Sequence, residues 1–495
     1  MAEPLILAID QGTSSTKCLL VDPRSAVVAR GSAPLGERHP RPGWVEQDAL
    51  EIWASVQAAV AACLDGQDPR RVAAIGFSTQ RESLVMWDRK TGEPVAPLIS
   101  WQDQRTGMVC DALRTPESER LARERSGLPL DPMFSAAKAS WLLDEHDPDR
   151  ARARCGELCL GTVDSWLMSR LGGEHVIEAG NASRTQLLDV RRCVWDDDLL
   201  DLFNVPEAAL PKVVSSTGPF PTARGLAPLP DGVPIHAVMG DSHAALFAHG
   251  AFAPGQIKAT YGTGSSVMGL AGDAANLDSG VCLTIAWAID RPALAAEGNI
   301  RSAGATLRWV ADVLGTSVAE LAELAAASTS DGVCLVPGFN GLGAPWWDGE
   351  AVGLLAGFTL GTTRGAIARA ALESIPHQVA DVLERIDRSV GQVRELFADG
   401  GSTENRTLMQ LQADLAGRTV LRSRTAELSA LGCAHLAGLG AGIWDWPALE
   451  ALPRERDRVE CRMGADERAA ARQHWRRAVG RASGAGGKIM TPQGR

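Results

Sequence analysis

Apolar runs alternate with polar segments along the chain, and the first of them predict a pair of strands. Residues 5–9 (LILAI) form an apolar run that predicts a buried strand, and residues 18–21 predict a second one. The polar segment DQGTSSTK lies between them at residues 10–17. Two apolar runs around so short a polar segment predict a β-hairpin.

The next segment of the chain has apolar residues at helical spacing. Apolar residues recur at helical intervals from Leu50 to Leu64, and Asp48 followed by Glu51 is the capping-box pattern, so the sequence predicts a helix up to about residue 64. Apolar runs at residues 72–78 and 235–239 predict further buried strands. Strands that alternate with helices predict an α/β fold.

Two segments of the chain share one pattern. AIDQGTSSTKCLLVD (residues 8–22) and KATYGTGSSVMGLAG (residues 258–272) each contain an apolar strand, a Gly-Thr turn with small hydroxyl residues, and a second apolar strand. The repeat indicates a duplicated α/β domain. A turn at Pro254–Gly255 precedes the second copy, so we expect an N-terminal domain over residues 1–252 and a C-terminal domain over residues 253–495.

The C-terminal segment is rich in arginine and alanine. Residues 468–481 (RAAARQHWRRAVGR) predict a solvated terminal helix, followed by a flexible tail from about residue 482. A helix that binds lipid or RNA is the alternative. It is disfavoured because no strong apolar face lies opposite the arginines.

Composition narrows the function classes. A formal net charge of −11 argues against a nucleic-acid partner. No apolar run reaches the ~18 residues of a membrane span, so no membrane insertion is expected, and the N-terminus lacks a signal-peptide pattern. The ten cysteines are scattered without zinc-site spacing, so free thiols in a reducing cytoplasm are expected.

The Gly-Thr turns can bind an anion. Such a turn exposes several backbone N–H groups, adds hydroxyl donors and lets phosphate oxygens approach closely. An ordinary hairpin is the alternative for either turn alone, but one turn in each half favours a polyphosphate. Asp10 beside phosphate would require a cation, and Mg²⁺ takes one or two carboxylates together with phosphate oxygens. Lys17 either meets a terminal phosphate or lies solvated at a strand end. Neither a P-loop nor a dinucleotide-binding pattern is found.

Acidic and basic residues follow two of the predicted strands. Asp241 comes after the strand at 235–239, where it serves either as a helix N-cap or as a base that deprotonates an alcohol, and both roles can hold together. Arg81 and Glu82 follow the strand at 72–78 and form either a surface ion pair or a donor and an acceptor for neighbouring hydroxyls of a polyol. Trp101 is either a core residue or an apolar wall of that site.

These and further motifs resemble one known family in their order along the chain. TQRES, GTVDSWL, NASRTQLLDV, GDSHAALF, TYGTG, GLGAPWWD and DGGSTEN are similar to motifs of the FGGY carbohydrate kinases and, within them, of the glycerol kinases. The resemblance covers roughly residues 5–480. It implies an actin/hexokinase-type ATPase fold, in which two ribonuclease-H-like domains bind ATP and Mg²⁺ in the cleft between them.

The resemblance also implies roles for individual residues. Asp10 would belong to the magnesium site, and Asp241 would be the catalytic base. Lys17 stands where glycerol kinases usually carry arginine, so it keeps the charge and loses the bidentate fork, and Arg308 stands where glutamine is common. The residues expected to bind the nucleotide are Thr13, Ser14, Ser15, Lys17, Thr263, Gly304, Arg308, Gly401 and Asn405.

The acceptor site agrees with the glycerol kinases only in part. Arg81, Glu82, Trp101 and Asp241 match the glycerol site, whereas three positions carry a different side chain: Met133 for tyrosine, Ser242 for glutamine and Ser266 for phenylalanine. The changes imply a wider pocket. One carbon of substrate size is worth only ~1–3 kcal/mol, so glycerol stays the leading substrate and erythritol, a pentitol or xylulose the runner-up. The residues QRE at 80–82 favour a polyol, because xylulokinases usually carry Met-His there.

Other expectations complete the prediction. A non-catalytic actin-like nucleotide switch is the alternative from another class, but it would not need Asp241 beside Arg81 and Glu82. The segment before the strand at 235–239 lacks the loop that binds fructose 1,6-bisphosphate in some glycerol kinases, so such regulation is not expected. Because dimers and tetramers are common in the family, the resemblance implies a homodimer or homotetramer without choosing between them.

Overall fold

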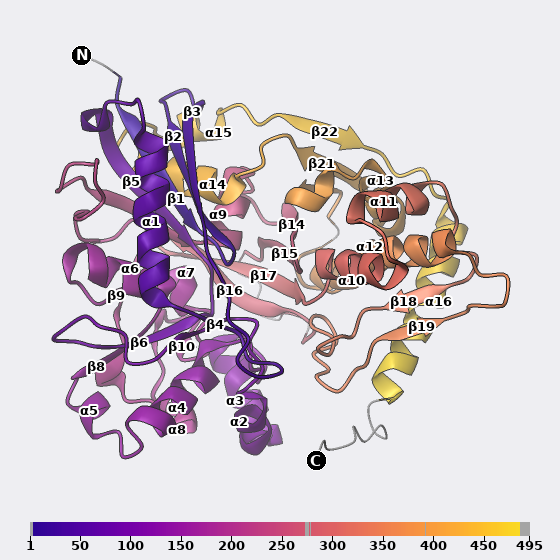
Figure 1. Ribbon diagram of the computed structural model, residues 1–495, viewed down its shortest axis with the longest axis horizontal. Coiled ribbons are helices and arrows are strands. Elements are labelled where there is room, and N and C mark those ends of the chain that lie inside the picture. Colours follow the sequence, from indigo (N-terminus) through magenta and orange to yellow (C-terminus); the bar gives the residue numbers. More distant parts are fainter. Residues whose placement is uncertain (1–2, 273–276, 278, 392, 486–495) are drawn as a thin grey trace. The chain divides into compact units, whose positions relative to one another are not determined.

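The computed structural model describes residues 3–272, 277, 279–391 and 393–485, which form two compact units (Figure 1). The first unit comprises the chain up to Gly250 together with Leu283–Ala295 and Glu427–Pro453. The second unit comprises Ala251–Cys282, Ala296–Ala426 and the chain from Arg454 onward. Each unit therefore contains separate stretches of sequence, and the family-domain limits 1–252 and 253–495 stay a prediction.

The first unit is built on a five-stranded sheet with the order β13-β5-β1-β2-β3. Strands β1 (Leu5–Gln11), β5 (Val72–Thr79) and β13 (Ile235–Gly240) run parallel to one another. Strand β2 (Ser15–Val21) runs antiparallel to β1 and to β3 (Val27–Pro34), which confirms the predicted hairpin. The carboxyl ends of three strands consequently meet at one edge of the sheet.

Side chains alternate along β1 between two layers of helix. Leu7 and Ile9 share a hydrophobic cluster with Ile52 and Val56 of α1 (Ala49–Leu64). Ile6 lies instead against Gly438 of α14 (Leu428–Gly440). Since successive residues of a strand point to opposite faces, α1 and α14 cover opposite faces of the sheet.

The remaining helices and strands of the first unit lie around this sheet and beside it. They are β4 (Glu46–Gln47), β6 (Leu84–Asp88), β7 (Leu98–Ile99), α2 (Gly107–Leu113), α3 (Pro116–Ser126), α4 (Ser135–His146), α5 (Ala151–Arg154), β8 (Leu158–Thr162), α6 (Val163–Gly172), β9 (Val176–Glu178), α7 (Ala179–Ala182), β10 (Leu188–Asp189), β11 (Val194–Trp195), α8 (Asp197–Phe203), β12 (Lys212–Val214), α9 (Asp241–Ala248), β16 (Cys282–Ala288, of which all but Cys282 lies in this unit) and α15 (Trp446–Glu450).

Helix α1 begins as the sequence predicts. The Asp48 side chain accepts a hydrogen bond from the backbone nitrogen of Leu50 at 2.9 Å. Glu51, which was expected to close a capping box, accepts a hydrogen bond from Arg38 at 2.9 Å. The N-cap is therefore confirmed, and the reciprocal half of the box is wrong because an arginine outside the helix engages the Glu51 carboxylate.

The second unit repeats the strand order of the first. Its main sheet contains β17-β15-β14-β20-β21-β22 in that order. Strand β14 (Ile257–Tyr261) runs antiparallel to β15 (Ser265–Leu270) and parallel to β20 (Glu395–Asp399), which in turn runs parallel to β21 (Thr419–Ser423). Strands β17-β15-β14-β20-β21 thus correspond to β3-β2-β1-β5-β13. This correspondence confirms the duplicated α/β fold and its two Gly-Thr hairpins.

Further helices and strands complete the second unit, and β17 and β22 among them belong to this sheet. They are β17 (Pro292–Ile300, which crosses the unit boundary), α10 (Gly304–Leu314), α11 (Val318–Ala326), β18 (Cys334–Val336), β19 (Leu354–Ala356), α12 (Arg364–Val390), α13 (Arg406–Ala416), β22 (Arg456–Val459) and α16 (Ala465–Ala485).

Helix α16 is buried along one face, so the prediction of a solvated terminal helix is wrong. The Trp475 side chain is buried, and its indole Nε1 donates to Asp381 of α12 at 2.7 Å. Arg472 is also buried and forms an ion pair with the same carboxylate. Residues 482–485 of the predicted flexible tail are helical, and residues 486–495 lie outside the described residues.

All ten cysteines are free, as predicted, and most are buried, whereas Cys155 is exposed. In the described part of the chain, no helix combines the length and apolar character that crossing a bilayer requires.

Helices α9 and α14 approach each other closely at Gly432. A Cβ atom added there would lie 1.8 Å from the backbone oxygen of Ala244. Because a carbonyl within a helix cannot rotate away as the end of a side chain can, a larger residue would force the two helices apart.

Gly432→Ala is therefore expected to lower the midpoint of thermal unfolding, with a loss of about 1–3 kcal/mol in the free energy of unfolding. Gly480→Ala in α16 is the matched control, because a Cβ atom there meets nothing within 4 Å. Circular dichroism during heating compares the two variants. An unchanged midpoint for Gly432→Ala would contradict the close helix contact.

Candidate active site

Two carboxylates lie at the carboxyl edge of the first unit's sheet. Asp10 stands opposite Ser78 in the β1–β5 ladder, and Asp241 directly follows β13. The Ser78 hydroxyl donates to Asp10 at 2.8 Å. Burial raises the pKa of Asp10 to about 6; the Ser78 hydrogen bond lowers this pKa, and the charge of Asp241 raises it. The charge of Asp241 therefore disfavours the ionisation of Asp10.

Asp241 is held by one hydrogen bond and one ion pair. It is the first residue of α9, and Gly240 is the N-cap, so the prediction of Asp241 as the N-cap is wrong. Its Oδ1 accepts from the backbone nitrogen of Ser242 at 2.6 Å and lies 3.2 Å from Arg81 Nε. The Asp241 side chain is 40% exposed and the Arg81 side chain only 5%. A buried cation thus orients a carboxylate that solvent and a substrate can reach.

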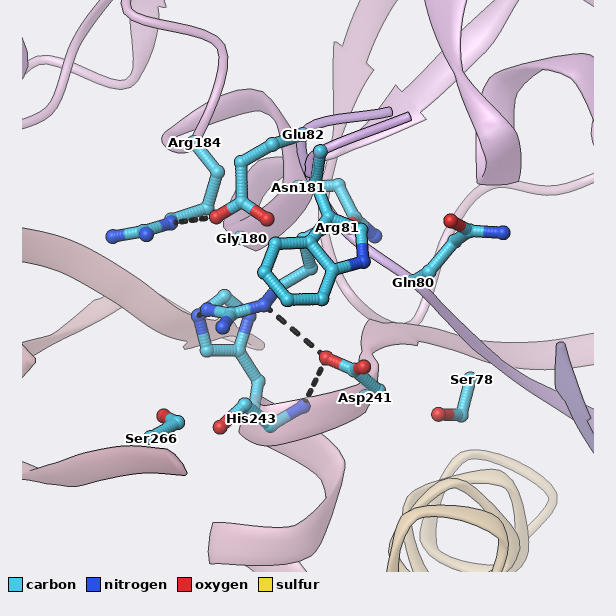
Figure 2. A network of polar contacts seen from close by, with 12 residues as sticks. Ser78, Gln80, Arg81, Glu82, Gly180, Asn181, Arg184, Asp241, His243 and Ser266 are labelled. Atoms are coloured by element: carbon cyan, nitrogen blue, oxygen red, sulfur yellow. Dashed lines mark hydrogen bonds and ion pairs between the residues drawn. The ribbon is translucent and has the colours of Figure 1, made fainter. Parts of the chain in front are cut away.

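Arg81 is confined by its neighbours (Figure 2). Its Nη1 lies 3.3 Å from His243 Nε2. Figure 2 shows both residues beside Asp241. A Cβ atom on Gly240 would lie 2.4 Å from Arg81 Cδ. A side chain at position 240 would occupy the space of the Arg81 side chain, so glycine is required there. His243 contacts the far end of the Arg81 guanidinium.

Glu82 is buried and conformationally strained. Its backbone φ is 61°, in the left-handed region that residues other than glycine seldom adopt. Arg184 Nε donates to its Oε1 at 2.6 Å, and the Ser135 hydroxyl donates to its carbonyl at 3.0 Å. The alternative of a surface ion pair between Arg81 and Glu82 is wrong, because both side chains are buried and each engages other groups. Strain of this kind is characteristic of functional sites.

The partners of Arg81 and Glu82, His243 and Arg184, were not predicted from the sequence. Arg184 is fully buried within the segment NASRTQLLDV, and His243 is fully buried in GDSHAALF. Both motifs were noted, but neither residue was given a role. A charged residue among small and apolar ones is the only local signal, because the partners Glu82 and Arg81 are distant in the sequence.

Trp101 and Met133 lie on loops of the first unit. The Trp101 indole Nε1 donates to the Thr13 hydroxyl at 3.1 Å, so Trp101 contacts the first Gly-Thr loop. Met133 is buried, and its carbonyl accepts a hydrogen bond from Lys138 Nζ. Burial lowers the pKa of Lys138 to about 8.

The first Gly-Thr loop is a tight turn with polar groups near solvent. The backbone nitrogen of Gly12 donates to the Ser15 carbonyl at 3.1 Å. Ser14 and Lys17 are exposed, and Thr13 and Ser15 are partly exposed. Lys17 lies opposite Asp10 in the hairpin, and its charge lowers the pKa of Asp10.

In the second unit, the other Gly-Thr loop packs against the start of α10. The Thr263 carbonyl accepts from the backbone nitrogens of Ala303 at 2.9 Å and Ala305 at 3.1 Å. Gly304 donates to the carbonyl of Gly262 at 3.0 Å. The Arg308 side chain donates to the Thr263 hydroxyl at 3.3 Å. The structure thus brings Thr263, Gly304 and Arg308 together.

The loop after β20 lies against the same end of the second sheet. A Cβ atom on Gly400 would lie 2.5 Å from the Tyr261 carbonyl oxygen, at the end of β14. A Cβ atom on Gly401 would meet nothing within 4 Å, so no protein atom accounts for glycine at that position. Asn405 accepts from the backbone nitrogen of Leu408 at 3.0 Å and caps α13.

Ser242 and Ser266, both expected at the acceptor site, lie in different units. Ser242 is buried directly after Asp241. Ser266 lies on β15 of the second unit, where its hydroxyl donates to the buried Glu297 at 2.8 Å.

The buried Asp10 carboxylate, with Asp241 near it, is a suitable ligand for a magnesium ion. The described residues include no group of three or more His, Cys, Asp or Glu side chains that could hold a metal. Mg²⁺ does not need such a group, because it takes one or two carboxylates with phosphate oxygens and waters. A cation beside Asp10 would offset both the burial of its carboxylate and the charge of Asp241.

Comparison with known proteins assigns the chain to a family. The FGGY family of carbohydrate kinases matches with its N-terminal domain over residues 5–248 and with its C-terminal domain over residues 257–441. An apulose kinase from Pectobacterium atrosepticum is 44% identical over 97% of this chain and 99% of its own length. A glycerol kinase from Geobacter sp. strain M21 is 43% identical over 96% of this chain and 98% of its own length.

A solved structure agrees with these sequence matches. The crystal structure of Plasmodium falciparum glycerol kinase with ADP superposes with a TM-score of 0.88 at 28% identity, over 97% of this chain and 98% of that one. The duplicated fold and both domain matches lead to the same assignment: this chain belongs to the FGGY family of carbohydrate kinases and is a phosphotransferase.

Proposed function

We propose that this kinase transfers the γ-phosphoryl group of ATP to a terminal hydroxyl of a small polyol, with glycerol as the leading substrate and glycerol 3-phosphate as its product. One observation carries the proposal: the accessible Asp241 carboxylate lies 3.2 Å from the buried Arg81 guanidinium, at the carboxyl edge of the sheet. In open α/β sheets, ligands bind at this edge. The glycerol kinase from Geobacter, at 43% identity, supports the substrate class.

Asp241 is the proposed general base. As the substrate oxygen bonds to phosphorus, its proton passes to the Asp241 carboxylate. The Ser242 backbone nitrogen and Arg81 hold that carboxylate in one orientation. Pre-orientation matters because proton transfer requires the base within hydrogen-bond reach of the hydroxyl.

Arg81 and Glu82 are the proposed holders of the neighbouring hydroxyls. A guanidinium only donates hydrogen bonds and an ionised carboxylate only accepts them, so together they suit adjacent hydroxyls of a polyol. His243 and Arg184 fix their positions. The Glu82 backbone has a φ of 61°, and Arg184 and Ser135 hold its carboxylate and its carbonyl.

Proposed nucleotide-binding residues occur in each unit. Thr13, Ser14, Ser15 and Lys17 would donate to phosphate oxygens from the first Gly-Thr loop. Mg²⁺, when bound at Asp10, supplies positive charge to the phosphate oxygens. In the second unit the proposed nucleotide-binding residues are Thr263, Gly304, Arg308, Gly401 and Asn405.

A larger acceptor is the second candidate. The apulose kinase from Pectobacterium is as similar to this chain as the glycerol kinases are, at 44% identity. The sequence differences at Met133, Ser242 and Ser266 also favour a wider pocket. Erythritol, a pentitol or a ketose such as xylulose therefore belongs in the same assay.

Purified protein with ATP and Mg²⁺ is expected to release ADP only when a polyol is added, and glycerol is expected to have the largest kcat/KM. A coupled ADP-release assay over polyols and ketoses of three to five carbons measures this. A four- or five-carbon substrate with the largest kcat/KM would replace glycerol. Slow ADP release that no added compound changes would support a nucleotide switch and refute the kinase.

Asp241→Asn is expected to reduce kcat at least ~10²-fold, because the amide cannot accept the proton. Asp111→Asn is the matched control, since it removes a carboxylate that is 74% exposed from the same unit. Steady-state kinetics with a thermal melt of each variant separates catalysis from folding. A folded Asp241→Asn enzyme with wild-type kcat would remove Asp241 from this role.

Asp10→Asn is expected to raise the Mg²⁺ concentration for half-maximal activity by about tenfold or more, because a neutral amide is a poorer ligand than a carboxylate. Magnesium titrations of wild type, Asp10→Asn and the Asp111→Asn control measure it. An unchanged magnesium requirement would place the ion elsewhere.

A further inference from the structure

A closed ring of hydrogen bonds joins the first Gly-Thr loop to the loop that carries Arg81. Its members are Thr13, Gln47, Gln80, Ser83 and Trp101. We propose that this ring makes Trp101 and the two glutamines positioning residues, which hold the phosphate-binding turn in register with the acceptor-binding loop. The inference rests on the proposed function, because that function places nucleotide at one loop and polyol at the other.

One side of the ring consists of buried amides. Gln47 Nε2 donates to the Thr13 carbonyl at 2.7 Å. Gln80 Nε2 donates to Gln47 Oε1 at 2.9 Å and to Gln11 Oε1 at 3.2 Å. Gln80 directly precedes Arg81. The Thr13 turn is therefore connected through Gln47 and Gln80 to the residue next to Arg81.

The other side of the ring runs through Trp101. The Ser83 hydroxyl donates to Gln80 Oε1 at 2.8 Å and accepts from the backbone nitrogen of Trp101 at 3.0 Å. The Trp101 indole Nε1 then donates to the Thr13 hydroxyl at 3.1 Å. Thr13 is therefore held twice, at its carbonyl by Gln47 and at its side chain by Trp101.

The geometry leaves each amide one orientation. The Thr13 carbonyl accepts only, so it requires the nitrogen of Gln47; Gly12 likewise accepts from Gln11 Nε2 at 2.8 Å. Gln11 and Gln47 must then each present the amide oxygen to Gln80, which fixes the orientation of the Gln80 amide as well. Rotating any one of them would bring two acceptors together in a site where these side chains are at most 1% exposed.

Trp101 consequently has a role that an apolar wall does not explain. An apolar wall requires only the face of the indole, whereas the ring of hydrogen bonds requires the indole N–H. If the N–H positions the phosphate-binding turn, its loss should weaken nucleotide binding. Loss of the wall should instead weaken polyol binding.

Trp101→Phe separates these two roles, since phenylalanine retains an aromatic face and has no donor. Calorimetry with Mg²⁺ and the non-hydrolysable analogue AMP-PNP is expected to show an affinity about fivefold lower, the effect of one neutral hydrogen bond. The matched control is Trp195→Phe, which removes an indole hydrogen bond to the Pro211 carbonyl in the same unit. Its AMP-PNP affinity is expected to equal that of wild type.

A double-mutant cycle with Thr13→Val tests the bond itself. If the Trp101–Thr13 hydrogen bond carries the effect, the double variant binds AMP-PNP no more weakly than Thr13→Val alone. An unchanged affinity for Trp101→Phe, or losses that multiply in the double variant, would overturn the inference.

The two proposals fail in different measurements. Wild-type protein that binds AMP-PNP but phosphorylates no polyol would refute the proposed function, and the calorimetric cycle would still decide whether the ring positions the turn. Wild-type protein that phosphorylates a polyol, together with a Trp101→Phe variant that binds AMP-PNP as tightly as wild type, would refute the positioning role and leave the proposed function intact.

Discussion

The ion pair between Arg81 and Asp241 is the interaction on which the candidate site depends. A guanidinium that is 5% exposed is unfavourable unless charged and polar groups surround it. Asp241 and His243 supply these groups from the start of one helix, and Gly240 supplies the space. Glu82, the next residue, is buried by the same turn and engages Arg184. Removing Asp241 or His243 would weaken the compensation of the buried Arg81 charge, so these residues depend on one another.

The duplicated topology explains why so few residues suffice for this chemistry. Each unit has a Gly-Thr hairpin at the start of its sheet and parallel strands that end beside it. In the first unit those strand ends carry carboxylates and a guanidinium. In the second unit the neighbouring segments carry glycine and amide side chains, as at Gly401 and Asn405. Charged groups occur there as well, because β20 ends at Asp399 and Arg308 donates to Thr263, so the second copy adds glycine and amide side chains to charged ones.

The sequence predicts what local interactions decide. The hairpin at Asp10 and the Asp48 cap are correct because their partners lie within a few residues. Prediction from the sequence fails where a contact joins residues that are far apart in the chain. Arg184 contacts Glu82 across 102 positions, and Arg472 of α16 contacts Asp381 across 91. Asp241 shows a subtler limit. The sequence identifies a helix start there, but in the structure Gly240 is the N-cap and Asp241 is the first residue of the helix.

The separated segments of the first unit constrain the order in which the chain can fold during synthesis. Domains commonly fold from the N-terminus as they emerge from the ribosome. Here, α14 covers one face of a sheet whose last strand, β13, ends at residue 240, and α14 itself begins only at residue 428. Until α14 emerges, that face lacks the contacts that α14 makes with β1, β5 and β13, so nascent chains would expose part of it while the second unit is being translated. A chaperone that shields this surface would act during that interval, and a ribosome stalled before residue 428 would leave an aggregation-prone intermediate.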